Sequence, residues 1–284
     1  MFGFLNVYKP KGKTSHDIVS ILRKITGVKQ IGHTGTLDPF AEGVLPICIG
    51  KATRLIEYLK DDKAYIGTIQ LGSSTTTYDI EGEKVNVNNN IIPSVDEIEQ
   101  ALRFFRGKIE QFPPVYSAIK VKGKKLYEYA RKGEEVKIEP RGVNIYRLEI
   151  VNYNKESKQL ELYIECSKGT YIRSIANDLG EKLGTYGHLI KLIRVNAGSF
   201  GVNESIKLED LQTKEDVEKH LIYPLEYLDY PKYELNEEEI NLVSNGMPLG
   251  INGFSSTVLL TYKGELAAVA EGFENKLLCR KVFL

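Results

Sequence analysis

The sequence predicts an α+β protein with a mixed, largely antiparallel sheet flanked by helices and loops. Three observations lead to this class. Amphipathic stretches with helix signals occur at 15–26, 94–106 and 174–183. Segments with the period of β-strands lie between them. Strands and helices follow one another irregularly rather than alternating one by one, which is typical of helices packed against an antiparallel sheet.

Each of the three helices is indicated by a local signal. In 15–26 the apolar residues recur at helical spacing, as Ile18, Val19, Leu22 and Ile25. Ser94 and Glu97 form a capping box for the second helix, and Gly107 ends it. Gly184 ends the third helix.

Strand patterns lie between the predicted helices of the larger part of the chain, and a small β unit follows this part. Strands are predicted at 64–71, 143–153 and 160–166, the last with strict alternation of apolar and polar residues. The small unit has an acidic helix over 236–244 and strands at 257–262, 265–271 and 277–283. We therefore expect two domains, 1–230 and 231–284.

Charge and cysteine content narrow the functional classes. The 38 Lys and Arg residues balance the 38 Asp and Glu residues, so a nucleic acid would have to meet a local basic patch. Residues 111–132 hold six basic groups and one acidic group, whereas 203–245 hold twelve acidic and four basic groups. Three widely spaced cysteines predict a reducing cytoplasm, and neither a signal peptide nor a membrane span is expected.

Several apparent motifs lack the context that their chemistry needs. Gly12-Lys13-Thr14-Ser15 resembles the end of a phosphate-binding loop, but the earlier glycine is absent. Ser117 lacks the flanking glycines of a nucleophile elbow. The four histidines show no zinc-binding spacing, so we expect neither a metal site nor a cofactor.

The segment 31–53 carries the most informative carboxylate. Asp38 directly precedes Pro39, which disfavours helical dihedral angles and predicts a loop that projects the Asp38 side chain. A loop-shaping hydrogen bond is the structural alternative. A paired-carboxylate glycosidase is a poor match, because Glu42 is only four residues from Asp38.

This segment resembles the catalytic motif of the TruB family of pseudouridine synthases, which isomerise a T-loop uridine of tRNA at position 55. The matching residues are Gly32-His33-Thr34-Gly35-Thr36-Leu37-Asp38-Pro39, Gly43-Val44-Leu45-Pro46 and Gly50-Lys51-Ala52-Thr53. Further likeness covers most of 3–200, including Lys9-Pro10, Tyr65 to Gly72, Gln111 to Arg131 and Cys166 to Arg173. One departure is Thr76, where the family usually has an aspartate, ahead of Asp79.

The resemblance implies a pseudouridine synthase catalytic domain and a role for each matching residue. Asp38 would be the nucleophile, able to attack either the sugar or the uracil ring, and Arg173 would hold it ionised through a charge-assisted bond. Tyr65 would be the third catalytic residue. The substrate-binding positions would be His33, which enters the T-loop, and Tyr65, Tyr171, Leu192 and Lys9, of which Lys9 could instead be structural.

The resemblance also implies how RNA is held. An RNA-gripping insertion at about 111–135, hereafter the insertion, would contact the phosphate backbone through Lys120, Lys122, Lys124, Lys125 and Arg131. Residues 231–284 would form a short PUA-like RNA-binding domain. The expected partner is the T-arm and elbow of tRNA, bound by a cytoplasmic monomer that needs no protein partner.

Two other functions remain possible from the sequence. An RNA chaperone would use the basic first half and the β tail to refold tRNA, and it would tolerate Asp38→Asn. A guide-RNA-dependent pseudouridylase has a larger C-terminal region, and the tail of about fifty residues here favours the standalone enzyme.

Overall fold

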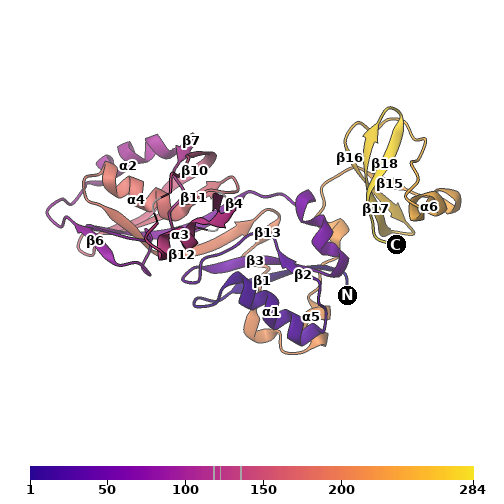
Figure 1. The fold of residues 1–284 in the computed structure, drawn as a ribbon, viewed down its shortest axis with the longest axis horizontal. Helices are drawn as coiled ribbons and strands as arrows, with labels where there is room; N and C mark the ends of the chain where they lie inside the picture. Colours follow the sequence, from indigo (N-terminus) through magenta and orange to yellow (C-terminus); the bar gives the residue numbers. More distant parts are fainter. Residues whose placement is uncertain (118, 122, 135) are drawn as a thin grey trace.

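The structure, a computed structural model, describes residues 1–117, 119–121, 123–134 and 136–284. In this part of the chain a ten-stranded sheet forms the body, and a four-stranded sheet lies near the C-terminus (Figure 1). The strand order of the large sheet is β14-β1-β3-β12-β4-β11-β10-β7, with β2 paired to β3 and β13 paired to β12. The mixed α+β class is confirmed.

The elements have the following bounds. The large sheet comprises β1 (Gly3–Lys9), β2 (Ile31–His33), β3 (Glu42–Ile49), β4 (Lys63–Leu71), β7 (Gly107–Gln111), β10 (Arg141–Asn154), β11 (Gln159–Cys166), β12 (Gly187–Ala197), β13 (Phe200–Gly201) and β14 (Ile206–Lys207). Two small hairpins are β5 (Ser73–Thr75) with β6 (Lys84–Val87), and β8 (Lys120–Val121) with β9 (Lys124–Lys125). The C-terminal sheet comprises β15 (Lys232–Glu234), β16 (Thr257–Tyr262), β17 (Glu265–Phe273) and β18 (Lys276–Val282).

Short helices surround the sheets. The α-helices are α1 (Ser15–Thr26), α2 (Val95–Leu102), α3 (Leu126–Arg131), α4 (Ile172–Lys182), α5 (Lys214–Lys219) and α6 (Glu237–Ser244). The 3₁₀ segments are η1 (Gly50–Tyr58), η2 (Arg103–Phe105), η3 (Leu208–Asp210) and η4 (Pro224–Glu226).

The helix predictions agree with the structure except at some ends. Helix α1 has the predicted bounds, and Ser94 and Glu97 form the capping box of α2. Helix α2 is shorter than predicted, because its last turn tightens into η2 before Gly107. Helix α4 begins two residues earlier than predicted, at Ile172, so that Arg173 lies in its first turn.

The pairing of the large sheet joins distant segments. Most pairs are antiparallel, but β12 runs parallel to β3 and antiparallel to β4, so it connects the two halves of the sheet. Apolar residues of β4, β11 and α4 form one core, and those of β1, β3 and α1 form another. The candidate site lies where these two halves meet.

The C-terminal sheet packs against η1. Lys51 donates hydrogen bonds to the carbonyl oxygens of Phe283 and Leu284, and Arg54 donates to that of Val282. Its apolar residues share a core with β1 and η1, whereas Leu235 and Val243 belong to a core within the C-terminal unit. The unit is thus held to the body by both polar and apolar contacts.

Candidate active site

The loop that carries Asp38 is fixed from three directions. Ser15, the first residue of α1, accepts a hydrogen bond from the Leu37 amide at 2.8 Å. The Asp38 carbonyl accepts from the Ala41 amide at 3.1 Å. Arg194 of β12 donates to the carbonyls of Gly35 and Val44 at 3.1 and 2.7 Å. Because its backbone is held in this way, the loop can present one carboxylate in a fixed position.

Arg173 lies beside that carboxylate, as the sequence predicts. Its Nε is 2.9 Å from Oδ2 of Asp38, and its Nη2 is 3.4 Å from Oδ1. The Arg173 side chain is 7% exposed. A guanidinium that meets both carboxylate oxygens fixes their orientation as well as their charge.

Burial and a neighbouring charge have opposite effects on the ionisation of Asp38. Its side chain is 33% exposed, and it lines a cavity. Burial raises the pKa of Asp38 above its ordinary value, and the positive charge of Arg173 opposes this shift. Arg173 therefore favours the ionised form of Asp38, which without this charge would take up a proton more readily.

The cavity at Asp38 has a volume of about 900 Å³. Its walls bring together five of the residues predicted to act on the substrate, namely Asp38, Tyr65, Tyr171, Arg173 and Leu192. The insertion contributes Tyr116, Ser117 and Tyr127. The site is thus composed of segments from both halves of the sheet and from the insertion.

Both predicted tyrosines present neutral phenols to this cavity. Tyr65 lies on β4 and is 7% exposed. Burial raises the pKa of Tyr65, while the neighbouring Arg194 acts in the opposite direction. Burial also raises the pKa of Tyr171, which immediately precedes α4. At neutral pH either hydroxyl can donate a hydrogen bond.

Two predicted substrate-binding residues, His33 and Lys9, lie outside the described lining of the cavity. His33 is half-buried, and its Nδ1 is buried with no hydrogen-bond partner among the described residues. Burial lowers the pKa of His33, with a further contribution from Arg194, so that the imidazole is neutral at neutral pH.

Lys9 is fully buried and occupies a structural position. Its ammonium donates to the carbonyl oxygens of Pro10, Lys13 and Pro39 at 3.1, 2.6 and 3.4 Å. These bonds tie the end of β1 to the loop that carries Asp38. The geometry therefore agrees with the structural alternative for Lys9 rather than with contact to the substrate.

Sequence reasoning missed two charged residues of the site. Asp79 is 2% exposed, and its Oδ2 lies 3.2 Å from Nη1 of Arg173. Arg194 is fully buried and holds the loop before Asp38. An arginine within the apolar pattern of 187–197 is a signal that could have indicated Arg194, but the partner of Asp79 follows only from the tertiary structure.

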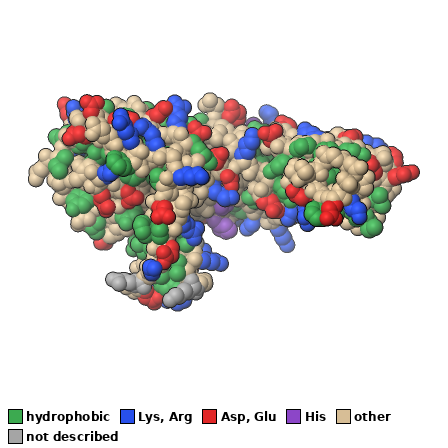
Figure 2. Space-filling model, turned by 90° about the horizontal axis from the view of Figure 1, so that it is seen from above, with side chains coloured by type: hydrophobic (Ala, Val, Ile, Leu, Met, Phe, Trp, Pro, Cys, Tyr) green, Lys and Arg blue, Asp and Glu red, His purple; other side chains and the backbone are tan. Residues whose placement is uncertain are grey.

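The insertion projects from the body of the molecule and carries lysine side chains (Figure 2). Lys120, Lys124 and Lys125 lie on its short hairpin, and Lys120 and Lys124 are exposed. Lys125 lies over the ring of Tyr127 at 5.4 Å. Lys122 and the side chain of Arg131 fall outside the described residues.

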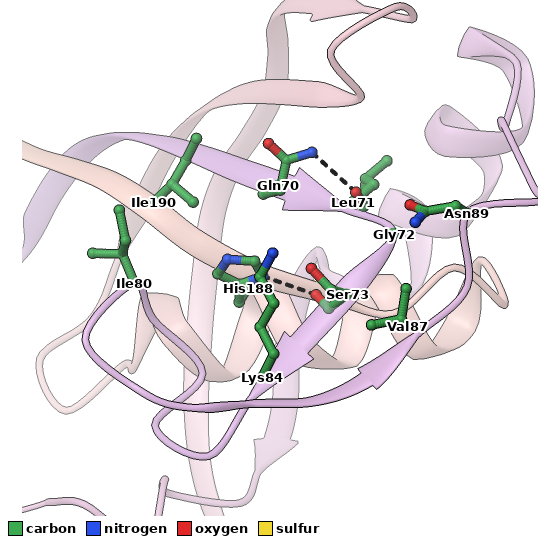
Figure 3. A pocket seen from close by; sticks show the side chains of 10 residues that line it. All are labelled: Gln70, Leu71, Gly72, Ser73, Ile80, Lys84, Val87, Asn89, His188 and Ile190. Atoms are coloured by element: carbon green, nitrogen blue, oxygen red, sulfur yellow. Dashed lines mark hydrogen bonds between the residues drawn. The ribbon is translucent and has the colours of Figure 1, made fainter.

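Another cavity, of about 440 Å³, lies at the far end of β4 from Tyr65 (Figure 3). It is lined by Gln70, Leu71, Ser73, His188 and the hairpin of β5 and β6. His188 bonds through Nδ1 to the Ser73 carbonyl at 2.8 Å. None of the predicted site residues contributes to its described lining.

Within the described ranges, no group of three or more His, Cys, Asp and Glu could hold a metal ion. No helix in the same ranges is long and apolar enough to cross a membrane.

The chain is similar to known proteins over its whole length. Residues 23–172 match the model of the TruB family pseudouridylate synthase N-terminal domain, and 173–228 match that of the tRNA pseudouridylate synthase B C-terminal domain. It is 46% identical to tRNA pseudouridine synthase B of Caldanaerobacter subterraneus subsp. tengcongensis, over 86% of this chain and 85% of that protein. The same-named protein of Streptococcus gordonii is 42% identical over 100% of both chains.

A solved structure gives the same fold. A Cbf5-Nop10-Gar1 complex contains a chain that is 25% identical, with a TM-score of 0.68 over 100% of this chain and 85% of that one.

Proposed function

The chain belongs to the TruB family of pseudouridylate synthases. From this premise we propose which of its residues carry out catalysis and which bind RNA. The protein is a tRNA pseudouridine synthase, an isomerase that converts uridine in tRNA to pseudouridine. We propose that its target is the T-loop uridine at position 55. The observation that carries the proposed mechanism is the contact of Arg173 with Asp38, 2.9 Å from Nε to Oδ2, on the wall of the cavity.

The reaction breaks the N-glycosidic bond, turns the uracil and rejoins it to the ribose through carbon. Product and substrate have the same atoms, so the chain's own side chains can carry the chemistry. Asp38 is the nucleophile and forms a covalent intermediate with either the sugar or the uracil ring. By the end of the reaction uracil C5 is bonded to C1′ of the ribose in place of N1, the C5 proton has been lost, N1 has gained a proton and the Asp38 carboxylate is free again. The anionic form of Asp38 is required, which the charge of Arg173 favours.

The detached base has to be kept in place while it turns. Tyr65, Tyr171 and Leu192 line the same cavity as Asp38, and they can enclose a flipped uracil between aromatic and apolar surfaces. The neutral hydroxyl of Tyr65 or Tyr171 can donate to a uracil oxygen. His33, a neutral imidazole, is proposed to enter the T-loop in place of the flipped base.

RNA is held by the insertion and by the C-terminal unit. Lys120, Lys124 and Lys125 on the insertion are proposed to contact phosphates, with Lys122 and Arg131 of the same segment. Residues 1–230 act as the catalytic domain and 231–284 as a short PUA-like RNA-binding domain. We propose that the enzyme works in the cytoplasm as a monomer, without a protein partner.

The decisive experiment uses an unmodified tRNA transcript. Purified protein is incubated with it, without added nucleotide or metal, and pseudouridine is mapped at single-base resolution. We expect one new pseudouridine in the T-loop with the wild type and with Glu42→Gln, and none with Asp38→Asn. Glu42 is a suitable control because it is a neighbouring carboxylate four residues along the chain.

The other outcomes would contradict specific parts of the proposal. Tight binding of tRNA by the wild type without modification would favour the RNA chaperone. Modification by Asp38→Asn at the wild-type rate would remove Asp38 from the role of nucleophile. Loss of activity in Glu42→Gln as well would return the paired-carboxylate alternative to consideration.

A further inference from the structure

Gln111 is a buried polar residue at the end of an exposed strand. It is the last residue of β7 and is 3% exposed, whereas the rest of β7 is exposed or half-buried. A buried amide is costly unless its donor and acceptor are both satisfied. The partners of Gln111 therefore indicate what it does.

Both polar ends of this side chain meet the same residue. Gln111 Nε2 donates to the carbonyl oxygen of Tyr171 at 2.9 Å, and Gln111 Oε1 accepts from the amide of Tyr171 at 2.8 Å. The Tyr171 carbonyl also accepts from the amide of Ile175 at 3.3 Å, one turn into α4. The amide of Gln111 thus fixes the backbone at the point where α4 begins.

The start of α4 carries two of the proposed site residues. Tyr171 precedes the helix, and Arg173 is its second residue. Among the described residues, the side chain of the N-cap residue Tyr171 makes no capping hydrogen bond. Instead, the side chain of Gln111, which lies outside the helix, bonds to the backbone of Tyr171, a residue that lines the cavity.

Further bonds extend this contact along the root of the insertion. Ser174 Oγ donates to the Phe112 carbonyl at 2.8 Å, and Arg173 Nη2 donates to the Tyr116 carbonyl at 3.2 Å. Pro113 and Pro114 lie between these carbonyls, are buried, and restrict the backbone there. Among the described residues, four hydrogen bonds therefore join 111–116 to 171–174.

We propose that Gln111 is a positioning residue for pseudouridine formation, which aligns Tyr171 and Arg173 with Asp38 by holding the backbone at the start of α4. It does not belong to the described lining of the cavity, so it acts through these residues and not on the substrate. Since the insertion begins at Gln111, the same contact couples the segment proposed to hold RNA to the catalytic pair. This inference rests on the proposed roles of Asp38, Arg173 and Tyr171.

The test separates the chemical step from RNA binding. Gln111→Met keeps the length of the side chain and removes both hydrogen bonds. We expect its single-turnover rate constant at saturating enzyme to fall about 10²-fold, because small displacements of reacting groups have effects of that order. The dissociation constant for tRNA should be unchanged. The matched control is Gln70→Met, since Gln70 likewise donates to backbone carbonyls, those of Leu71 and Ser157, but at the other cavity (Figure 3).

Gln111→Glu provides a readout that general weakening of the fold would not give. When protonated, the introduced carboxyl can donate to the Tyr171 carbonyl and accept from its amide, as the native amide does. When ionised, it faces that carbonyl without a proton. We therefore expect its rate, relative to wild type at the same pH, to rise as pH falls. This variant decides the question if Gln111→Met does not fold.

Three results would overturn the inference. These are a wild-type rate for Gln111→Met, a loss confined to tRNA affinity, or no pH dependence in the relative rate of Gln111→Glu. An inactive Asp38→Asn run beside them would show that the proposed function holds even if the role of Gln111 does not. An active Asp38→Asn would instead remove the premise.

Discussion

Asp38 and Asp79 bind the same guanidinium through different nitrogens. Arg173 Nε lies 2.9 Å from Asp38 Oδ2, and Nη1 lies 3.2 Å from Asp79 Oδ2. Asp79 is held in turn by the hydroxyl of Thr77 and the amide of Glu81. One carboxylate faces the cavity, while the other anchors the arginine from the protein interior.

Arg173→Lys should retain the positive charge but lose the planar fork. A single ammonium cannot meet Asp38 and Asp79 with the same geometry. We expect the single-turnover rate of pseudouridine formation to fall about 10²-fold or more. A rate equal to that of the wild type would contradict an orienting role for Arg173.

Asp79→Asn should keep the shape of the side chain that contacts Arg173 but remove its negative charge. Arg173 would then lose its interior ion pair, and its alignment with Asp38 would weaken. We expect kcat to fall about 10²-fold with little change in KM, because Asp79 does not belong to the described lining of the cavity. Steady-state kinetics on a tRNA transcript measure both, and a change confined to KM would be evidence against this anchor.

Asp38→Asn should make the fold more stable at neutral pH. Burial raises the pKa of Asp38, so the folded protein binds this proton more tightly than the unfolded chain does. Stability from this group is therefore lost as pH rises from about 3.9, the unfolded value, through the raised folded value. Thermal unfolding should show a higher Tm for the variant at pH 7 and no difference below about pH 3.9. A lower Tm at pH 7 would mean that pairing with Arg173 outweighs burial.

Lys9→Met should destabilise the protein by about 1–3 kcal/mol, because three buried or partly buried carbonyls lose their donor. Burial lowers the pKa of Lys9 to about 8, which is consistent with its enclosed position. Denaturant unfolding measures the change. The exposed neighbour Lys11 provides the control, and Lys11→Met should have wild-type stability.

Substitution of Lys124 and Lys125 by Ala together should reduce the dependence of tRNA affinity on salt. Each phosphate contact contributes about 0.7–0.9 to the slope of log K against log salt, so a reduction of roughly 1.5 is expected. The modified position should not change. Replacement of Lys214 and Lys219 on α5 is the matched control, and an equal reduction there would argue against a specific grip by the insertion.

The sequence was sufficient for elements whose signals are local. Helix α1 has the predicted bounds because the apolar spacing of Ile18 and Leu22 does not depend on distant partners. The resemblance to a known family led to Asp38 and Arg173, 135 residues apart. Asp79 and Arg194 could not be assigned in this way, because their roles depend on which backbone or charge lies opposite them after folding. For Lys9 the sequence left a substrate contact and a structural role open, because the carbonyl oxygens that its ammonium meets are known only after folding.

The place of β12 in the large sheet has a consequence for how the protein is made. This strand, Gly187–Ala197, joins β3 to β4, yet it follows both by more than a hundred residues. During synthesis β3 and β4 therefore cannot be joined in one sheet until β12 has been made. Arg173 and Arg194 also emerge late, so a nascent chain holds Asp38 without the cations beside it. We expect catalytic competence to appear only after the ribosome has released β12, and refolding to be slow because its pairings are distant in sequence.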